Sequence, residues 1–349
     1  MSDVVIIGAG MAGASLAAEL AGSASVTILE AEAAPGYHST GRSAAFWSES
    51  YGGPLIQPLT SASGPLLAGF LSPRGALHIA DAEGEGAIEA MAGDFPGLLE
   101  PLGRLALEAA IPGLRPGWDR GLAEPSCADI DVAGLHAACL KRARQGGAEL
   151  VTDFRVQSIE RAGGRWRIGP YQADVVVNAA GAWADEVAAR AGERPLGIRP
   201  YRRTIAQLRV DPPAPAGLPL VVDAAERFYF KPDAGGRLWL SPHDETPCEP
   251  CDCAPEELDV AVAIDRLQKV VDWRVLAVER KWAGLRSFAP DRLPVYGFSA
   301  SRRGFFWCAG QGGFGIQTAL AAARMAADLL LGRTPEIDAA PYLATRFAA

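Results

Sequence analysis

The chain has 349 residues, 49% hydrophobic and 21% charged, and its 33 basic and 41 acidic side chains give a net charge of −8. A chain this apolar can bury enough surface to fold, which excludes intrinsic disorder, and the acidic balance argues against a dedicated nucleic-acid-binding protein. Length alone suggests about two domains. The best apolar stretch, residues 4–20, is broken by glycines and lacks the basic start of a signal peptide. We therefore expect a cytoplasmic protein without a membrane span, and its six cysteines do not suggest a disulfide framework.

The first 30 residues predict one β-α-β unit. Residues 4–7 form a β-branched run before a glycine-rich turn, which is typical of a buried parallel strand. Residues 14–21 are good helix formers, and residues 25–29 predict a second strand that ends at Glu30.

The glycines of the turn fit a dinucleotide-binding fingerprint, G-x-G-x-x-G. Gly8 permits the tight turn, Gly10 lets the backbone approach a pyrophosphate at the helix N-terminus, and Gly13 lets the helix pack on the sheet. We expect Glu30 to accept hydrogen bonds from a ribose, which disfavours the 2′-phosphate of NADP. The fingerprint alone does not decide between FAD and NAD.

The rest of the chain alternates between loops, helices and short strands. Residues 34–53 predict a loop, and residues 58–134 mix helical pieces with proline-broken loops. Helices are predicted at 86–91, 135–145 and 316–331. Strands are predicted at 151–160, 166–168, 175–177, 205–210, 220–222, 228–230, 237–240 and 305–308. The short alternating runs between about 200 and 290 predict an antiparallel sheet.

Five further segments carry a resemblance to a known family. They are residues 35–45 (PGYHSTGRSAA), 177–184 (VNAAGAWA), 229–235 (YFKPDAG), 282–286 (WAGLR) and 310–318 (GQGGFGIQT). With these segments the chain resembles the D-amino-acid oxidase family of FAD-dependent oxidoreductases, and within it the bacterial FAD-dependent D-arginine dehydrogenases. The resemblance implies noncovalent FAD and an α/β fold of the two-domain α+β type.

The resemblance also implies how the two domains divide the chain. A Rossmann-like FAD-binding domain is expected from residues 1–75, 135–200 and 290–349. An inserted substrate-binding domain, built on an antiparallel sheet, is expected from residues 76–134 and 201–289.

A set of residues is expected to contact FAD by the same resemblance. The loop from Ser39 to Ala44 should run along the flavin, and the backbone of Val156 should meet the adenine side. The turn before the last helix should reach the pyrimidine end of the flavin, where a helix N-terminus stabilises negative charge. The full set is Gly8, Gly10, Met11, Ala12, Gly13, Glu30, Ser39, Thr40, Arg42, Ser43, Ala44, Val156, Ala180, Gly181, Trp183, Gly312, Gly313, Phe314, Gly315, Ile316 and Gln317.

The substrate residues are carried over in the same way. Arg286 matches the arginine that clamps the substrate carboxylate, for which a guanidinium is suited because it binds bidentately and keeps its charge. Arg203 matches a second pocket arginine, although next to Arg202 it could instead be a solvated basic pair. Tyr51 and Tyr229 match two pocket tyrosines, although Tyr229 could be plain packing. The remaining pocket positions are Phe46, Ser48, Ala76, Leu220, Val222, Gly284 and Gly313.

Two departures from the arginine-specific relatives bear on the substrate. Ala76 stands where those enzymes have a glutamate that holds a cationic side chain, and Phe46 stands where they have a histidine. A cationic substrate would then be desolvated without a partner. We therefore expect an apolar or aromatic D-amino acid, although Glu49 could restore part of the negative charge.

The expected reaction is oxidative deamination. Hydride passes from the substrate Cα to flavin N5, and the resulting imino acid hydrolyses to a 2-oxo acid and ammonia. The electron acceptor is left open among a quinone, a carrier and O2. Alternative functions are oxidation of a secondary or N-methyl amino acid, oxidation of a 2-hydroxy acid, a flavin-binding subunit of a heteromeric dehydrogenase, and a nicotinamide-dependent dehydrogenase.

A cluster of possible metal ligands lies outside these motifs. His243, Cys248, Cys251 and Cys253 have the spacing H-x4-C-x2-C-x-C, but the C-x-C step is tight for a tetrahedral site. The segment is rich in proline and acids, which favours a surface loop, so we predict no metal. Cys308 is interpreted as a buried core thiol.

Overall fold

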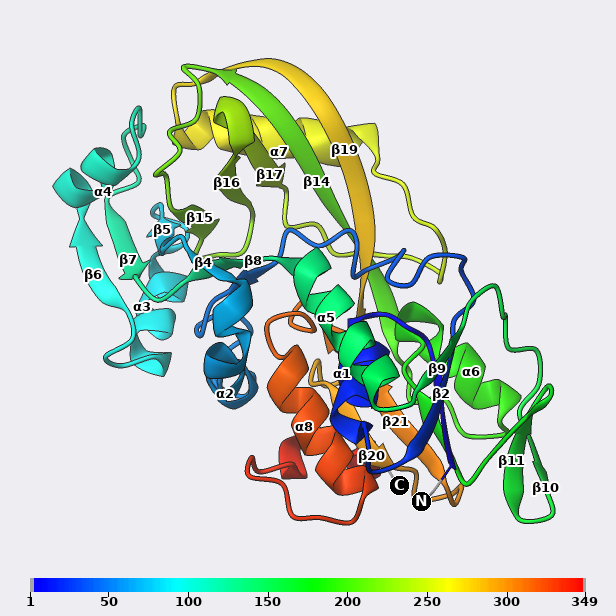
Figure 1. Cartoon of the computed structure of the whole chain (residues 1–349). Helices are drawn as coiled ribbons and strands as arrows, with labels where there is room; N and C mark the ends of the chain where they lie inside the picture. The colour runs from blue at the N-terminus through cyan, green and yellow to red at the C-terminus, as the bar shows by residue number, and fades with distance from the viewer. Residues whose placement is uncertain (1–2, 348–349) are drawn as a thin grey trace.

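The computed structural model describes residues 3–347, which form two layered units that share a cleft (Figure 1). Each unit is built on one large sheet. In both sheets, strands that are far apart in the chain lie side by side. The domain bounds expected from the sequence stay a prediction.

The first unit is built on a six-stranded sheet in the order β20-β21-β13-β1-β2-β9. All neighbouring strands are parallel except β20, which is antiparallel to β21. The strands are β1 (Asp3–Ile7), β2 (Ser25–Leu29), β9 (Glu149–Val151), β13 (Val175–Asn178), β20 (Val295–Phe298) and β21 (Phe305–Ala309). Both faces of this sheet are covered, which explains why its strands are hydrophobic runs without alternation.

Helices cover one face of the six-stranded sheet and a small sheet covers the other. Val4 and Ile6 pack toward the helical side, and Val5 and Ile7 pack toward the opposite side. The helices are α1 (Met11–Leu20), α5 (Val132–Gln145) and α8 (Ala319–Leu330). The small sheet consists of β10 (Glu160–Ala162), β11 (Arg165–Ile168) and β12 (Tyr171–Ala173), and α6 (Ala184–Arg190) lies beside it. This arrangement confirms the predicted β-α-β unit.

Two predicted elements of this unit differ from the structure. The strand predicted at 151–160 is wrong: β9 ends at Val151, and a strand resumes only at Glu160. In between, Asp153 has a φ of +55°, and the backbone N–H of Phe154 donates to the carbonyl of Glu30 instead of joining a ladder. The last helix begins at Ala319 and not at residue 316, because a turn precedes it.

The second unit is built on a ten-stranded sheet in the order β22-β19-β14-β17-β16-β15-β5-β7-β6, with β18 paired to β14. Its strands are β5 (Ala76–Ala80), β6 (Glu100–Gly103), β7 (Arg120–Glu124), β14 (Arg199–Asp211), β15 (Leu220–Asp223), β16 (Tyr229–Asp233), β17 (Arg237–Ser241), β18 (Thr246–Pro247), β19 (Arg274–Phe288) and β22 (Gln311–Gly312). The predicted antiparallel sheet is confirmed except at one pairing, β5 with β15, which is parallel.

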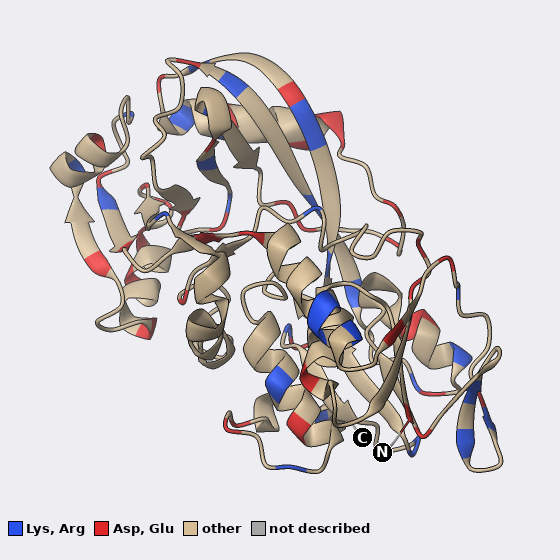
Figure 2. Cartoon of the chain, viewed as in Figure 1, with Lys and Arg blue, Asp and Glu red and all other residues tan. Residues whose placement is uncertain are grey.

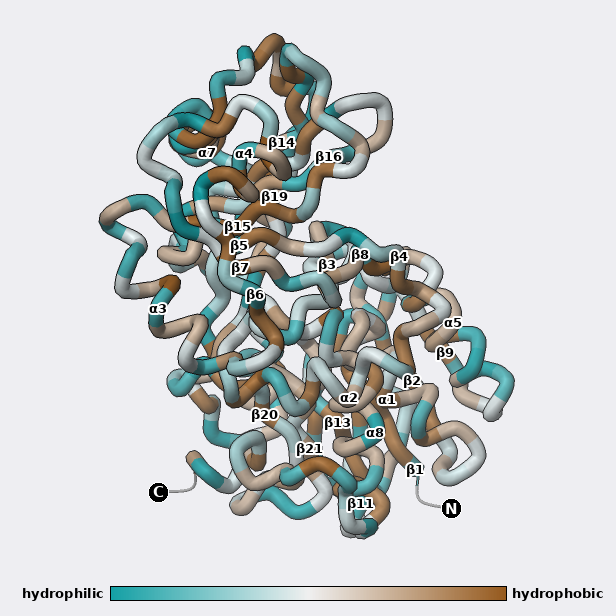
Figure 3. The backbone as a smooth tube through the Cα atoms, turned by 90° about the vertical axis from the view of Figure 1, so that its left-hand side faces the viewer, coloured by the Kyte–Doolittle hydropathy of each residue, from teal (hydrophilic) through white to brown (hydrophobic). Residues whose placement is uncertain are grey.

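Side chains of the ten-stranded sheet alternate between two environments. Val221 and Phe230 pack in the cluster formed with α7 (Glu257–Val270), whereas Val222 and Tyr229 face the opposite side. Figure 3 shows hydrophobic stretches along the neighbouring strands β15 and β5. The face that carries Tyr229 is the one turned toward the cleft.

Backbone pairing joins the two units. In Figure 1 the long strands β14 and β19 run from the α7 end toward the six-stranded sheet. At that end Ser287 and Phe288 of β19 pair with Gly312 and Gln311 of β22, which leads into α8. The remaining strands and α-helices are β3 (Phe46–Trp47), β4 (Leu71–Pro73), β8 (Ala128–Ile130), α2 (Gln57–Leu67), α3 (Glu85–Asp94) and α4 (Arg104–Ala110).

Acidic and basic residues are interspersed over both units (Figure 2). Within residues 3–347, no helix has the length and apolar character needed to cross a membrane.

Candidate cofactor and substrate site

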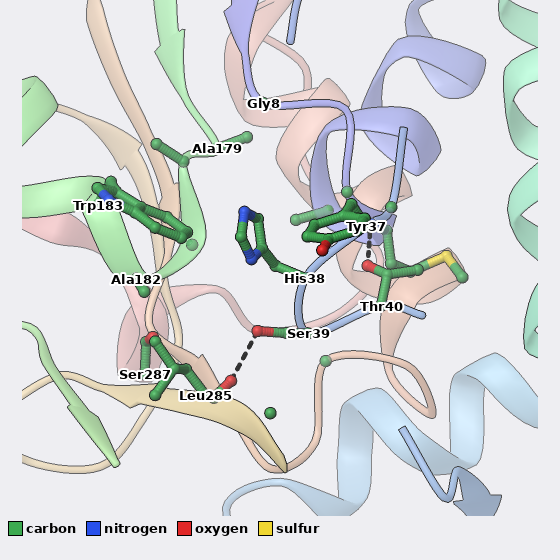
Figure 4. A pocket seen from close by; sticks show the side chains of 18 of the residues that line it. Gly8, Tyr37, His38, Ser39, Thr40, Ala179, Ala182, Trp183, Leu285 and Ser287 are labelled. Carbon is green, nitrogen blue, oxygen red and sulfur yellow. Dashed lines mark hydrogen bonds between the residues drawn. The ribbon is translucent and has the colours of Figure 1, made fainter. Parts of the chain in front are cut away.

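One large cleft runs between the two units, with an empty volume of about 1590 Å³ including its open mouth. Its walls come from the ends of the parallel strands, the loop after β2, and the strands β14, β16 and β19. Figure 4 shows part of this wall from close by.

The turn from β1 into α1 forms one end of the cleft. Gly8 has a φ of +104°, and a Cβ atom there would lie 2.5 Å from the carbonyl oxygen of Ala179. At Gly13 a Cβ atom would lie 2.0 Å from the carbonyl oxygen of Gly8, so only glycine allows the helix to approach the strand. Gly10 caps the helix without a side-chain hydrogen bond. The backbone donors at this N-terminus suit a pyrophosphate.

Glu30 lies at the end of β2, beside that turn. One of its carboxylate oxygens accepts a hydrogen bond from the backbone N–H of Ala9 at 2.7 Å, and the other accepts from Glu32 N–H at 3.0 Å. The carboxylate lines the cleft, which is the position that a ribose hydroxyl requires.

The loop after β2 forms a long side of the cleft. The Ser39 hydroxyl donates to the carbonyl of Leu285 at 2.7 Å, which joins the loop to β19. The ring of His38 lies between those of Tyr37 and Trp183, with centroid distances of 5.0 and 4.7 Å (Figure 4). Tyr37 and His38 line the cleft but were not singled out from the sequence, although they belong to a motif that was.

Most of the residues expected to contact FAD line this one cleft. Those that do are Gly8, Gly10, Met11, Ala12, Glu30, Ser39, Thr40, Arg42, Ser43, Ala44, Val156, Ala180, Gly181, Trp183, Gly312, Gly313, Gly315 and Ile316. The other three residues do not line the cleft but contact residues close to it. Gly13 packs on Gly8, the ring of Phe314 packs on Tyr51, and the Gln317 side chain donates to the carbonyl of Tyr51 at 2.9 Å. The arrangement therefore fits a bound dinucleotide, and the individual contacts stay predictions.

Two arginines lie at the substrate end, on neighbouring strands. Arg203 pairs with Gly284 in the β14–β19 ladder. Arg286 pairs with Tyr201, so both arginines share one face of the sheet. Arg203 is 3% exposed; its Nε donates to the carbonyl of Asp244 at 2.8 Å, and its Nη1 is buried without a hydrogen-bond partner. Burial, and next the charge of Arg286, lowers the pKa of Arg203.

Aromatic side chains and a glycine surround these cations. The guanidinium of Arg286 lies 5.9 Å from the centroid of the Tyr51 ring, and Tyr229 is buried in the cleft wall. A Cβ atom at Gly313 would lie 2.9 Å from Nη1 of Arg286 and 3.1 Å from the Tyr51 hydroxyl. Glycine at this position therefore leaves room for a ligand beside the guanidinium.

Tyr51 and five other expected pocket residues do not line the cleft. Phe46, Ala76, Leu220 and Val222 pack with Tyr229 in a hydrophobic cluster behind the cleft wall. The fifth is Ser48, whose hydroxyl donates to the Glu124 carboxylate at 2.8 Å.

Glu124 is the centre of a buried polar network behind that wall. Its carboxylate is fully buried and accepts hydrogen bonds from the hydroxyls of Ser48 and Ser50, at 2.8 and 2.6 Å. His78 Nε2 lies 3.2 Å from the same carboxylate. Burial acts to raise the pKa of Glu124, but the hydrogen bond and charge of His78 and the two serine hydroxyls outweigh it and lower that pKa. The network holds the turn that leads to Tyr51, because the Tyr51 N–H donates to the carbonyl of Ser48.

His243 does not line the cleft, but it lies beside the two tyrosines expected in the substrate pocket, which the sequence did not reveal. Its ring lies 5.8 Å from that of Tyr229 and 6.5 Å from that of Tyr51. Nδ1 lies 2.5 Å from the carbonyl oxygen of Glu226, and Nε2 is buried without a partner. Burial, followed by the charges of Arg203 and Arg286, holds the pKa of His243 well below 6.5, so the ring is neutral. In the sequence, His243 is only a histidine that follows a predicted strand. Its contacts with Tyr51 and Tyr229 depend on segments far away in the chain, which no local pattern shows.

The cysteines that follow His243 are separate from it. Cys248, Cys251 and Cys253 pack near the cleft wall, whereas His243 contacts the two tyrosines. Over the described part of the chain, no group of three or more His, Cys, Asp or Glu side chains is arranged to hold a metal ion.

Comparison with known proteins gives the family. The profile of the family described as FAD dependent oxidoreductase, DAO, matches residues 3–329. The chain belongs to this family. Glycine oxidase of Pseudomonas aeruginosa is 31% identical to this DAO family member over 256 residues, which cover 69% of this chain and 67% of the relative. The hydrogen cyanide synthase subunit HcnC of the same species is 28% identical over 219 residues, covering 61% of this chain and about half (51%) of that subunit.

Solved structures of other proteins share the fold of this chain over nearly its whole length. The glycine oxidase of Geobacillus kaustophilus superposes with a TM-score of 0.85 at 25% identity, and the match covers 99% of both chains. L-proline dehydrogenase from P. horikoshii gives a TM-score of 0.85 at 22% identity over 99% of this chain and 98% of that one. These findings confirm the predicted fold class and the FAD cofactor. The narrower resemblance to D-arginine dehydrogenases finds no support in the two Pseudomonas relatives, a glycine oxidase and a hydrogen cyanide synthase subunit.

Proposed function

We propose that this DAO family member oxidises the Cα–N bond of an α-amino acid whose carboxylate is held by Arg286 and Arg203. One observation carries the proposal: two neighbouring guanidinium groups face the same end of the cleft. Asp244 and Glu245 meet Arg203 through Nε and Nη2, which leaves Nη1 buried and unpaired. Adjacent cations with a free donor favour an anionic ligand, and a guanidinium binds a carboxylate through two parallel hydrogen bonds.

The substrate amine and the hydride lost from Cα also need partners in the site, and His243 lies close to the tyrosine neighbours of the two arginines. FAD, when bound, supplies the two-electron acceptor. Because a carbonyl oxygen can only accept, Nδ1 of His243 carries the proton in its bond to Glu226, and Nε2 is left as an acceptor. We assign this Nε2 to the substrate amine, from which it accepts a hydrogen bond. The imino acid product then hydrolyses to a 2-oxo acid and ammonia.

We retain an apolar or aromatic D-amino acid as the proposed substrate. Among the described residues that line the cleft, the acidic ones are Glu30 and Glu32, which belong to the β2 end and not to the arginine end. The carboxylate of Glu49 accepts a hydrogen bond from Ser61 and does not line the cleft. Asp244 and Glu245 lie beside Arg203 but do not line the cleft, and they are already paired with Thr204, Arg203 and Arg292. A cationic side chain in the cleft would therefore meet no free carboxylate at the arginine end.

Anaerobic reduction of the bound flavin tests this substrate class. The purified enzyme would be mixed with D-phenylalanine, D-leucine, D-arginine, glycine, L-phenylalanine, N-methylglycine and D-lactate, and the loss of flavin absorbance would be followed. The proposal predicts the fastest bleaching with D-phenylalanine or D-leucine. Faster bleaching with D-arginine would contradict the specificity argument, and faster bleaching with glycine, N-methylglycine or lactate would assign the site to that class.

A second candidate function rests on the similarity to HcnC, whose name describes a synthase subunit. In that case the chain binds FAD but needs a partner chain for turnover. Flavin that stays oxidised with every compound of the panel would favour this candidate. Reoxidation of the reduced flavin in air, compared with a soluble quinone, would identify the electron acceptor class.

A further inference from the structure

The loop between β18 and α7 holds two thiols against each other. The Sγ atoms of Cys248 and Cys251 lie 3.5 Å apart, and both side chains are partly exposed. Glu249 and Pro250 form the two-residue spacer of a C-x2-C pair. The sulfurs would need to approach by about 1.5 Å to reach a disulfide bond length of about 2.05 Å.

Both ends of this loop are tied to the walls of the cofactor cleft. The backbone N–H of Cys248 donates to the carbonyl of Pro200 at 3.1 Å, beside the pairing of β18 with β14. At the other end, Asp252 forms an ion pair with Arg42 and accepts a hydrogen bond from the Tyr37 hydroxyl at 3.0 Å. Arg42 also donates to the carbonyl of Cys253 at 3.1 Å.

The residues at the second end belong to the cleft itself. Tyr37 and Arg42 line it, and the guanidinium of Arg42 lies 5.1 Å from the centroid of the Tyr37 ring. The three cysteines pack in one cluster with Trp183 and Leu285, which also line the cleft. A change of bonding in the loop would therefore act directly on residues that line the cofactor cleft.

We propose that Cys248 and Cys251 form a reversible disulfide that tightens the closure of the Tyr37–Arg42 segment over the cofactor cleft. The oxidant is a peroxide: the two thiols lose two protons and two electrons and form one S–S bond, and hydrogen peroxide takes up both and becomes two water molecules. A small-molecule thiol reverses the step by exchange. The disulfide restricts the loop, so Asp252 stays bound to Arg42 and Tyr37.

Oxidation of this pair should become faster as the pH rises. Burial, together with the neighbouring Cys251 thiol, raises the pKa of Cys248 to about 11. Because the thiolate is the reactive form, the fraction of reactive Cys248 grows about tenfold for each pH unit below that value.

The experiment uses the FAD-loaded full-length protein. It is reduced with dithiothreitol, desalted and treated with hydrogen peroxide at pH 8.5, after which free thiols are alkylated and the peptides are mapped by mass spectrometry. The proposal predicts a Cys248–Cys251 link, lighter by two hydrogen atoms than the reduced peptide. FAD release, followed by flavin fluorescence after dilution, should be about fivefold slower in the oxidised protein, as expected if one residue's backbone freedom is removed from the open loop.

Variants separate this pair from the other thiols. Cys248→Ser and Cys251→Ser should lose both the link and the slower release, and dithiothreitol should restore fast release in the wild type. Cys139→Ala, in the buried core beside α1, is the matched control and should keep both effects. A missing link, a dominant Cys251–Cys253 link, or equal FAD release from the reduced and oxidised proteins would overturn the proposal. None of these results depends on the identity of the substrate.

Discussion

At the scale of single residues, the doublet Arg202–Arg203 shows how strand geometry gives neighbours different roles. Successive side chains of β14 point to opposite faces. Arg202 turns to the α7 side and forms ion pairs with Glu256 and Asp259, whereas Arg203 turns into the cleft. Each guanidinium keeps one buried donor without a hydrogen-bond partner, but only that of Arg203 belongs to a residue that lines the cleft. The doublet is therefore not a solvated basic pair, and Arg203 is the member that we propose binds an anion together with Arg286.

Arg203→Lys tests this difference. A lysine cannot reproduce the planar fork of the guanidinium, so we expect the KM for the amino acid to rise about 10- to 100-fold while FAD stays bound. Arg202→Lys is the matched control on the other face and should change KM by less than about threefold. Steady-state kinetics of the two variants provide the comparison, and equal effects would argue against an anion site at Arg203.

His243 makes a prediction about stability and pH. Its folded-state pKa lies well below 6.5, so as the pH falls through 6.5 the unfolded chain takes up a proton that the folded chain does not. The free energy of unfolding should therefore decrease on acidification, and this one group should account for about 1 kcal/mol between pH 7.5 and pH 5.5. Urea denaturation at both pH values should show a smaller decrease for His243→Asn. An identical pH dependence in the two proteins would mean that His243 is not held neutral.

At the scale of elements, the site depends on contacts between segments far apart in the chain. Glu124 ends β7, yet it accepts hydrogen bonds from the hydroxyls of Ser48 and Ser50 in the turn after β3. That turn carries Tyr51 to Arg286. The buried carboxylate thus positions Tyr51, which we propose for the substrate site, without lining the cleft itself.

Glu124→Gln should loosen this positioning. An amide group cannot accept at both ends, so at least one serine hydroxyl or backbone N–H loses its acceptor, at a cost of about 1–3 kcal/mol in the free energy of unfolding. Urea denaturation measures the loss, and KM should rise with it. Glu108→Gln, at an exposed i,i+4 partner of Arg104, is the control and should cost less than about 0.5 kcal/mol. A loss at Glu124 no larger than that of the control would contradict the role given to the network.

Gly13→Ala tests the packing of α1 on β1. The new methyl group would overlap the carbonyl of Gly8, so the turn must shift and FAD retention should fall at least about tenfold. Gly86→Ala in α3 is the control, because a Cβ atom there meets nothing within 4 Å. It should retain FAD like the wild type and be as stable or slightly more stable. Equilibrium dialysis with FAD gives the comparison, and normal retention in Gly13→Ala would mean that the turn tolerates a side chain.

At the scale of the whole molecule, the sequence predicts those parts of the fold whose residues follow one another within a short stretch of the chain. The β-α-β unit could be predicted because strand, glycine turn, helix and acid follow one another within 30 residues. The strand at 151–160 could not, because its backbone bonds to the loop after β2. The place of Ala76 behind the cleft wall depends on the pairing of β5 with β15, which no local pattern specifies. His243 was missed for the same reason, because its tyrosine neighbours come from other segments.

The central claim is that Arg286 and Arg203 bind the carboxylate of an amino acid beside FAD. The most direct test is the anaerobic rate of flavin reduction by D-phenylalanine and by 2-phenylethylamine, which lacks the carboxylate, in the wild type and in Arg286→Ala. Removing one partner of a buried charge pair costs about 3 kcal/mol, so the wild type should prefer the amino acid by at least about 100-fold and the variant should lose most of that preference. An equal preference in both proteins would contradict the claim.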